Sequence, residues 1–189
     1  MTPALPATAH ALELKHAYRL LNTGASILIS AAQGGRRDVM ACAWNMSLDF
    51  SPAKVAVCLD KATFTRELIE ASGSFAIGVP CVAQADLVFT VGSISGRELP
   101  GQDKFAAFGI AHHAATMIDA PLVAGCIGWL ECRLLPEPHL QQAHDLFIGE
   151  AVAAWVDERA FEGGKFRPLD DTLPACRTLH HLGAGNFVV

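Results

Sequence analysis

Short apolar segments separated by glycine turns are the feature that most limits how this chain can fold. ASILISAAQ begins at Ala25, RRDVMACAW begins at Arg36, and Gly34-Gly35 stands between them. Two strand-like segments joined by two glycines are typical of an antiparallel β-hairpin. The sequence therefore predicts antiparallel pairing from its first strands onward.

Further strands and short helices follow this hairpin. KVAVCLD predicts a strand at residues 54–60, TRELIEA predicts a helix at about residues 65–71 that Ser72-Gly73 ends, and SFAIGV predicts another strand. VAQADLVFTVG is compatible with a helix, whereas SISGRELPGQDKFAAFG indicates a long loop, a kind of segment that often carries function. The remaining strand candidates lie at about residues 125–135, 139–148, 148–156 and 177–182.

The order of these elements indicates the fold class. Strands do not alternate with long helices, so a doubly wound parallel sheet is disfavoured. We expect a mainly β protein with added helices, built as a mostly antiparallel barrel. A chain of 189 residues fits one domain. We expect a flexible tail at residues 1–12 and a single domain at residues 13–189, in which Leu14, Tyr18 and Leu21 have the spacing of a short amphipathic helix.

Charge and composition narrow the class of partner. Fourteen Lys and Arg stand against nineteen Asp and Glu, which gives a net charge of −5. A chain without excess basic charge lacks the electrostatic footprint of a nucleic-acid-binding protein. Hydrophobic residues make up 51% of the chain and charged residues only 17%. This balance favours burial of apolar surface between subunits, so we expect an oligomer that does not bind nucleic acid.

The expected cellular location of the protein follows from the absence of a membrane span and of a secretory signal in the sequence. No apolar run approaches the roughly 18 residues that suggest a membrane span. Residues 1–11 contain no Lys or Arg and no sustained apolar stretch, unlike a secretory signal. The six cysteines form no CxxC pair and lie mostly within apolar segments, which is typical of buried thiols. We expect a cytoplasmic protein with no membrane contact and with reduced, structural cysteines.

The short signatures of several enzyme classes are absent. The chain contains no GxGxxG after a strand, no GxxxxGK[ST], no GxSxG and no HExxH. Two adjacent histidine pairs, His112-His113 and His180-His181, could suggest a metal. Because neighbouring residues on a strand point to opposite faces, neither pair makes an easy two-ligand site, and no metal is expected.

The segment KATFTR, at residues 61–66, lies where a strand gives way to a helix. Two cations, two hydroxyls and the free N–H groups of a helix start would suit a phosphate monoester. Alternatively, Thr63 or Thr65 only caps the helix and the cations are solvated. Glu67 favours capping, because a carboxylate there competes with a bound anion. The spacing alone leaves both interpretations open.

The stretch VMACAWNMSLDFSPAKVAVCLDKATFTRELIEASGSFAIGVP resembles the core of the flavin reductase-like, FMN-binding split-barrel family. This family includes flavoredoxins and the reductase components of two-component monooxygenases. The likeness continues in DKFAAFG, CIGWLECRLL and HDLFIGEAVAAWVD, and covers roughly residues 15 to 187. The order and spacing of these pieces make the resemblance specific, although Ser51-Pro52, Gly78 and Asp145 depart from residues that family members often carry.

The resemblance implies a Greek-key barrel that forms a homodimer, with FMN near the subunit interface and NADH or NADPH as electron donor. It places the segment Ala43 to Ser47 along the flavin, and His144 near the nicotinamide or the flavin face. Lys104 and His180 are weaker candidates for contact with the cofactor. Because the flavin supplies the redox chemistry, no catalytic triad is expected. The flavin segment comprises Ala43, Trp44, Asn45, Met46 and Ser47, and the implied phosphate ligands are Lys61, Thr63, Thr65 and Arg66.

Several of these residues have a plain structural alternative. Trp44 and Met46 could serve only as core or interface packing. His144 would share strand parity with Leu146 and Ile148, so it could be a buried histidine. At the level of function, three hypotheses remain: an NAD(P)H-dependent flavin reductase, a flavoredoxin-like electron carrier, and a non-redox protein that binds another planar ligand on the same barrel.

Overall fold

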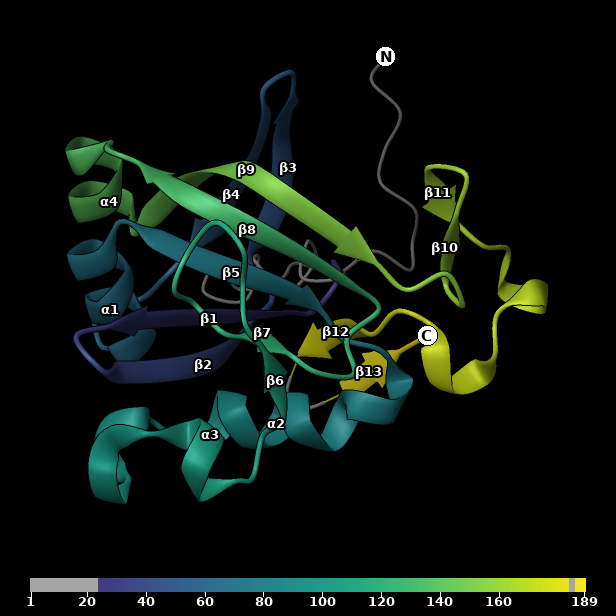
Figure 1. Ribbon diagram of the computed structural model, residues 1–189, viewed down its shortest axis with the longest axis horizontal. Helices are drawn as coiled ribbons and strands as arrows, with labels where there is room; N and C mark the ends of the chain where they lie inside the picture. Colours follow the sequence, from purple (N-terminus) through teal and green to yellow (C-terminus); the bar gives the residue numbers. More distant parts are fainter. Residues whose placement is uncertain (1–23, 184–185) are drawn as a thin grey trace, which may run out of the picture.

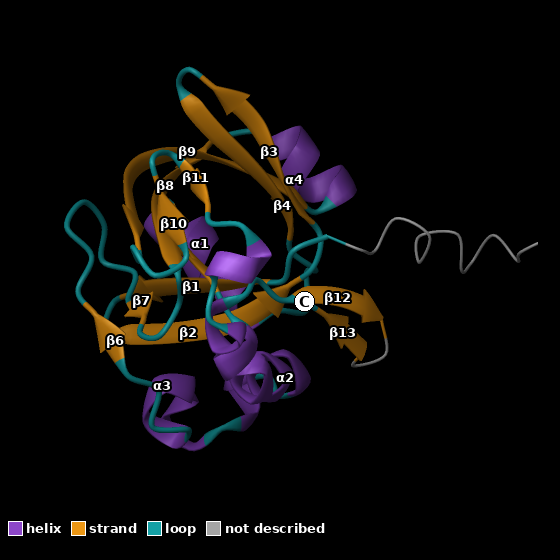
Figure 2. Cartoon of the chain, turned by 90° about the vertical axis from the view of Figure 1, so that its right-hand side faces the viewer, coloured by secondary structure: helices purple, strands orange, loops and turns teal. Residues whose placement is uncertain are grey.

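The protein is described here by a computed structural model, which covers residues 24–183 and 186–189. The tail at residues 1–12 and the helix expected to carry Leu14, Tyr18 and Leu21 lie outside the described residues. Seven strands form one antiparallel sheet that curves around a central core (Figures 1 and 2). In spatial order, these strands are β2 (Arg36–Cys42), β1 (Ile27–Gln33), β5 (Ser74–Val79), β8 (Gly128–Leu135), β9 (Leu146–Val156), β4 (Ala53–Cys58) and β3 (Asn45–Phe50).

Local sequence explains the first hairpin and the first helix. Gly34 and Gly35 both have positive φ, as a two-residue hairpin turn requires, and β1 pairs with β2 from Ile27–Cys42 to Gln33–Arg36. Helix α1 (Phe64–Ser72) ends where Gly73 takes a left-handed conformation and donates to the Ile69 carbonyl. Both elements agree with the sequence prediction.

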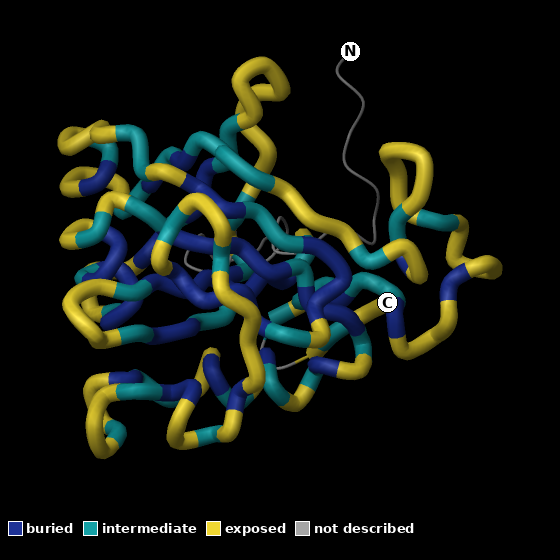
Figure 3. Tube along the Cα trace, in the orientation of Figure 1, coloured by how far each residue is buried: buried dark blue, intermediate teal, exposed yellow. Residues whose placement is uncertain are grey.

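Helices α1 and α4 (Pro138–His144) lie at one end of the sheet, and α2 (Ala85–Ser93) and α3 (Lys104–Ala107) cover one outer face (Figure 1). The buried side of α1 packs with inward-facing residues of the strands in the largest core cluster, whose side chains include Ile29, Leu68, Phe75 and Phe147. Buried backbone follows the strands through the molecule (Figure 3). On the outside of β1 and β2, α2 and α3 pack as a second layer (Figure 1).

Shorter elements complete the described chain. Three two-stranded sheets flank the barrel, and single turns of 3₁₀ helix connect the larger elements. No helix among the described residues is long and apolar enough to cross a membrane. The short strands are β6 (His112–His113), β7 (Leu122–Val123), β10 (Phe161–Glu162), β11 (Lys165–Phe166), β12 (His180–Gly183) and β13 (Asn186–Val188). The 3₁₀ turns are η2 (Val82–Gln84), η3 (Gly96–Glu98), η4 (Pro100–Gln102), η5 (Leu169–Asp171) and η6 (Pro174–Cys176).

The predicted strand at residues 139–148 is wrong. Pro138 occupies the first turn of α4, where its missing N–H costs nothing and its fixed φ favours a helix. The helix ends at Asp145, which has a left-handed φ of 55°, and β9 begins only after it. His144 is therefore an exposed residue in the last turn of a helix, and the predicted strand parity with Leu146 and Ile148 does not exist.

Strand β3 was not predicted. It is an edge strand, and its hairpin with β4 extends beyond the body of the barrel (Figure 1). Its side chains are exposed from Met46 to Phe50, so burial does not impose the apolar-polar alternation that marks a strand in sequence. Pairing with β4, and not local pattern, makes this segment extended.

Candidate functional site

The end of β2 borders three adjoining hollows on the molecular surface. They measure about 260, 300 and 300 Å³, and Ala41 lines all three. Together we call them the β2 groove. Its lining includes Met40, Ala41, Cys42, Ala43 and Trp44 from the end of β2, Thr63 before α1, Gly92 and Ser93 at the end of α2, and His144 and His181.

The start of α1 forms one side of the β2 groove. Thr63 is extended, with φ −76° and ψ 138°, and its side chain does not cap the helix. Instead, the Thr63 hydroxyl donates to the Asp60 carbonyl at 2.8 Å. The capping alternative from the sequence therefore does not apply to Thr63, and the first N–H groups of α1 are left to an outside acceptor such as an anion.

Thr65 and Lys104 line the hollow of the β2 groove that also contains Thr63. Both side chains are buried and already make hydrogen bonds within the protein. Thr65 Oγ1 donates to Asp38 Oδ2 at 2.6 Å, and Lys104 Nζ donates to the carbonyls of Val39 and Val91 at 2.8 and 2.9 Å. Lys104 Nζ also lies 3.7 Å from Asp38 Oδ1. These side chains form a buried network beneath the groove, which leaves them little freedom to bind a phosphate.

Arg66 points away from the groove into the protein. Its guanidinium donates to the carbonyls of Leu59 and Gln141, and it forms ion pairs with Glu70 and Asp145. With 4% of the side chain exposed, these bonds hold the end of α4 against α1. Arg66 is placed as a structural residue.

Lys61 is exposed, and its Nζ donates to the Gln142 carbonyl at 2.8 Å. It stands two residues before Thr63 but is absent from the lining of the groove. A cation that the sequence did not single out lies near the same helix start: Arg97 donates to the Ala62 carbonyl at 2.6 Å and to Glu67 at 2.9 Å. Glu67 is shared with Arg36, and these two hydrogen bonds lower the pKa of its carboxyl group.

Trp44, His144 and His181 line one hollow of the β2 groove. Trp44 is 52% exposed and follows directly after β2, so its indole is a surface feature and not core packing. His144 reaches the hollow from the last turn of α4. His180 was predicted as a cofactor contact, but His181 is the histidine of this pair that lines the hollow. Alternation along β12 allowed only one of the two to face this side, and nothing local indicated which.

The remaining predicted residues lie along a different cavity. Asn45, Met46, Ser47 and His180 help to line a space of about 580 Å³ on the inner side of the barrel. Asn45 Nδ2 donates to the carbonyls of Ala25 and Cys42, and so fixes the turn from β2 into β3. The predicted flavin segment thus borders two spaces, the β2 groove at Ala43 and Trp44 and the barrel cavity from Asn45 onward.

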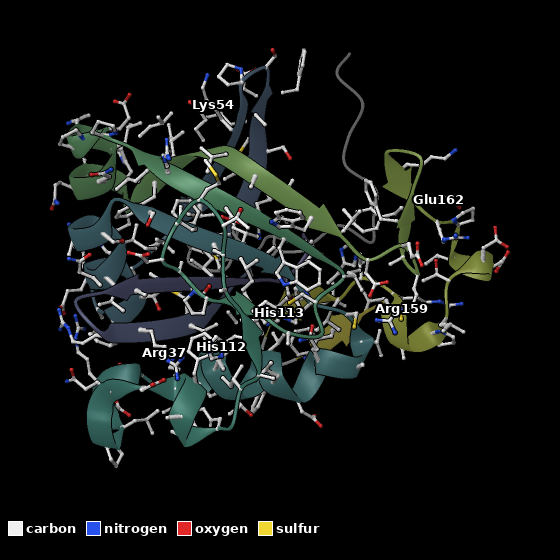
Figure 4. The ribbon with its side chains drawn as sticks, viewed as in Figure 1. Arg37, Lys54, His112, His113, Arg159 and Glu162 are labelled. Carbon is white, nitrogen blue, oxygen red and sulfur yellow. The ribbon has the colours of Figure 1, made fainter. Side chains whose placement is uncertain are left out.

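Neither the cysteines nor the two histidine pairs form a metal site among the described residues, where no three potential metal ligands lie together. Arg37 lies beside His112, with Nη1 2.9 Å from its Nε2, while His113 packs edge-on against Trp129 (Figure 4). All six cysteines are free, and burial raises the pKa of Cys42 to about 12. Such a thiol is a poor nucleophile at neutral pH.

Comparison with known proteins identifies the family. Residues 18–170 match the family described as the flavin reductase like domain. The chain belongs to this flavin reductase-like family. An uncharacterized protein of Escherichia coli K12, YddH, is 46% identical over 180 residues, which cover 94% of this chain and 92% of the relative.

Solved structures agree with the fold. An FMN-binding domain of a flavin reductases-like enzyme from Shewanella baltica OS155 is 44% identical, with a TM-score of 0.82 over 95% of this chain and 92% of that one. Flavoredoxin of Desulfovibrio vulgaris, at 24% identity and a TM-score of 0.74 over 98% and 92% of the two chains, shares the fold. The mainly β split barrel expected from the sequence is thereby confirmed.

The β2 groove fits a flavin mononucleotide. A planar ring system needs an open wall with an aromatic or backbone edge, and the exposed indole of Trp44 beside residues 40–43 supplies both. A phosphate needs N–H donors, which the uncapped start of α1 provides. Gly92 allows α2 to approach β2 closely beside the groove, since a Cβ there would come within 3.2 Å of the Ala41 Cβ.

Proposed function

We propose that this protein is a cytoplasmic FMN-dependent oxidoreductase that takes hydride from NADH or NADPH. The observation that carries the proposal is the β2 groove, which brings Trp44, the start of α1 and His144 to one surface. Membership of the flavin reductase-like family supports flavin chemistry in that groove. The six free thiols are compatible with a reducing compartment.

The chain's own residues would bind and orient the two substrates. Ala43 and Trp44 would lie along the flavin in the β2 groove, with backbone N–H groups as polar partners. Thr63, the first N–H groups of α1 and the nearby Lys61 would hold the phosphate. His144 would orient the nicotinamide from the rim of the groove. When bound, FMN supplies the hydride-accepting chemistry, so no protein acid or base is required.

We also propose that the protein is a homodimer that pairs through β3. Met46, Leu48 and Phe50 are 60%, 47% and 93% exposed and alternate along this edge strand, next to Trp44. Large apolar side chains gathered on an unpaired strand edge mark an interaction surface. Because Trp44 also lines the β2 groove, pairing at β3 would place the flavin near the subunit interface.

Light scattering of Phe50→Lys tests the dimer. A buried cation at the centre of an apolar interface is costly, so we expect the variant to be a monomer near 20.1 kDa while the wild type is a dimer. Leu173→Asp removes another exposed apolar side chain, from a loop outside β3, and serves as the control. A dimeric Phe50→Lys variant would exclude β3 as the interface.

The absorption spectrum of the purified protein tests the function. We expect the absorption spectrum of bound flavin after addition of FMN. When NADH or NADPH is then added without oxygen, we expect the flavin absorption band in the blue to disappear. If FMN binds but neither nicotinamide reduces it, the protein is an electron carrier of the flavoredoxin kind. If FMN does not bind, the oxidoreductase proposal is wrong and the hypothesis of a non-redox ligand-binding barrel is favoured.

A further inference from the structure

The flavin proposal does not use the cavity inside the barrel. This cavity measures about 580 Å³, within the range of small-molecule binding sites. Its inner wall is apolar and comes from inward-facing residues of β1, β4, β5 and β8. The segment after β9, from residue 160 to residue 178, lies across the end of the barrel where this cavity opens (Figure 2). The apolar wall comprises Ile27, Val55, Val57, Ile77, Val79 and Leu130.

One polar group stands out on the outer wall of this cavity. Arg177 forms no ion pair in the described part of the chain, where its guanidinium donates one hydrogen bond, from Nη2 to the Leu169 carbonyl at 3.0 Å. Its Nε is buried and has no hydrogen-bond partner there. A buried guanidinium donor without an acceptor is costly, and the Nε–Nη2 edge suits a carboxylate that accepts two parallel bonds.

A second arginine in the same wall provides the comparison. Arg167 also lines the cavity, but its Nη2 pairs with Glu162 at 2.9 Å and its Nε donates to the Glu158 carbonyl. Glu162 lies at the far edge of the molecule in β10 (Figure 4). Arg167 therefore has its acidic partner within the chain, whereas Arg177 has none among residues 24–183 and 186–189.

We propose that the barrel cavity binds an apolar monocarboxylic acid, whose body lies among the barrel side chains and whose carboxylate pairs with Arg177. Burial of the apolar body supplies most of the affinity, and the arginine fixes its orientation and selects acids over neutral analogues. This site is separate from the β2 groove, because among the lining residues of the two spaces Asn45 to Ser47 border only the cavity and residues 40–44 border only the groove.

Titration calorimetry of the full-length protein with 4-phenylbutyrate and 4-phenylbutan-1-ol tests the proposal. The two probes share an apolar body and differ in the carboxylate. We expect the acid to bind about 10- to 100-fold more tightly than the alcohol, as one charge-assisted pair implies. Arg177→Gln should remove this difference and leave the affinity for the alcohol unchanged, which also shows that the variant is folded.

Arg167→Gln is the matched control, and its acid affinity should stay within about threefold of the wild type, because Glu162 already neutralises Arg167. Leu130→Trp fills the cavity and should abolish binding of both probes. The proposal is overturned if the wild type binds neither probe, if Arg167→Gln has the effect expected of Arg177→Gln, or if Leu130→Trp still binds the acid.

A final titration with and without FMN separates this site from the flavin. The acid should bind equally well to the protein before and after saturation with FMN. Competition between the two ligands would show that the cavity belongs to the flavin site, and it would overturn the separate site while supporting flavin binding. Failure of FMN to bind at all leaves the acid titration interpretable, since neither probe depends on the flavin.

Discussion

Thr65 donates a 2.6 Å hydrogen bond to the carboxylate of Asp38, and both side chains are buried. Lys104 completes the cluster from α3, 3.7 Å from the other carboxylate oxygen. Burial raises the pKa of Asp38 and lowers the pKa of Lys104. The cluster joins β2, α1 and α3 beneath the β2 groove, so residues that look like phosphate ligands in sequence support the floor of the site.

Lys104→Met should lower the free energy of unfolding by about 3 kcal/mol, because it leaves the buried Asp38 carboxylate without its cation. Urea unfolding measures this loss. Asp38→Asn in the same chain should restore part of it by removing the uncompensated charge. Lys165→Met, at an exposed position in β11, should change stability by less than about 0.5 kcal/mol. Equal losses at Lys104 and Lys165 would contradict a buried ion pair.

Local patterns predicted those elements whose structure depends on neighbouring residues. The Gly34-Gly35 hairpin and the α1 helix follow from turn chemistry and helical spacing, and both form as predicted. The segment at residues 139–148 was predicted as a strand, but most of it forms helix α4. Pro138 favours the helix start, and the Arg66 guanidinium holds the helix against α1. The first acts locally, but the second comes from 75 residues away through its bond to the Gln141 carbonyl.

In the candidate site, too, sequence predicted some residues, whereas others depend on contacts between distant parts of the chain. Thr63 and His144 were predicted and meet in one hollow. His181 and Arg97 were missed, since their positions depend on strand facing and on how the loop after α2 folds back. Lys104 and Thr65 line one hollow with Thr63, but sequence could not show that Asp38 engages both of them.

Lys61→Ala should weaken FMN by about 10- to 100-fold and leave riboflavin almost unaffected, because only FMN carries a phosphate that forms a charge-assisted bond. Lys61 must exchange its present bond to the Gln142 carbonyl for this contact. Fluorescence titration with both flavins measures the ratio within one variant. Arg97→Ala tests the neighbouring cation in the same way. If Lys61→Ala weakens both flavins equally, the phosphate lies elsewhere.

His144→Ala should slow flavin reduction by NAD(P)H far more than it weakens FMN, since a residue at the groove rim contacts the second substrate. Rapid-mixing kinetics and an FMN titration separate the two effects. His139 offers a matched control on the same helix, exposed and with its ring 6.1 Å from that of His144. It is absent from the lining of the groove, so His139→Ala should leave reduction unchanged. Equal slowing in both variants would point to damage in α4.

Glu131 anchors the loop before β7 through its buried carboxylate. It accepts from the backbone N–H groups of Thr116 and Met117, from the Thr116 hydroxyl and from Trp155 Nε1. Burial alone would raise its pKa, but the hydrogen bonds, with Trp155 first among them, outweigh burial and lower the pKa below the ordinary value of 4.5. A lowered carboxyl pKa stabilises the fold above that ordinary value.

The resulting stabilisation should be complete above pH 4.5 and should disappear as the pH falls through the lowered pKa of the folded state. Glu131→Gln removes the charge, so we expect it to lose about 2 kcal/mol at pH 7 and to unfold with a weaker dependence on pH below 4.5 than the wild type. Urea midpoints at pH 7 and in acid measure both quantities. Glu158→Gln, at an exposed position, is the control and should follow the wild type. A Glu131→Gln variant that keeps the wild-type pH profile would show that this carboxylate carries no linked stability.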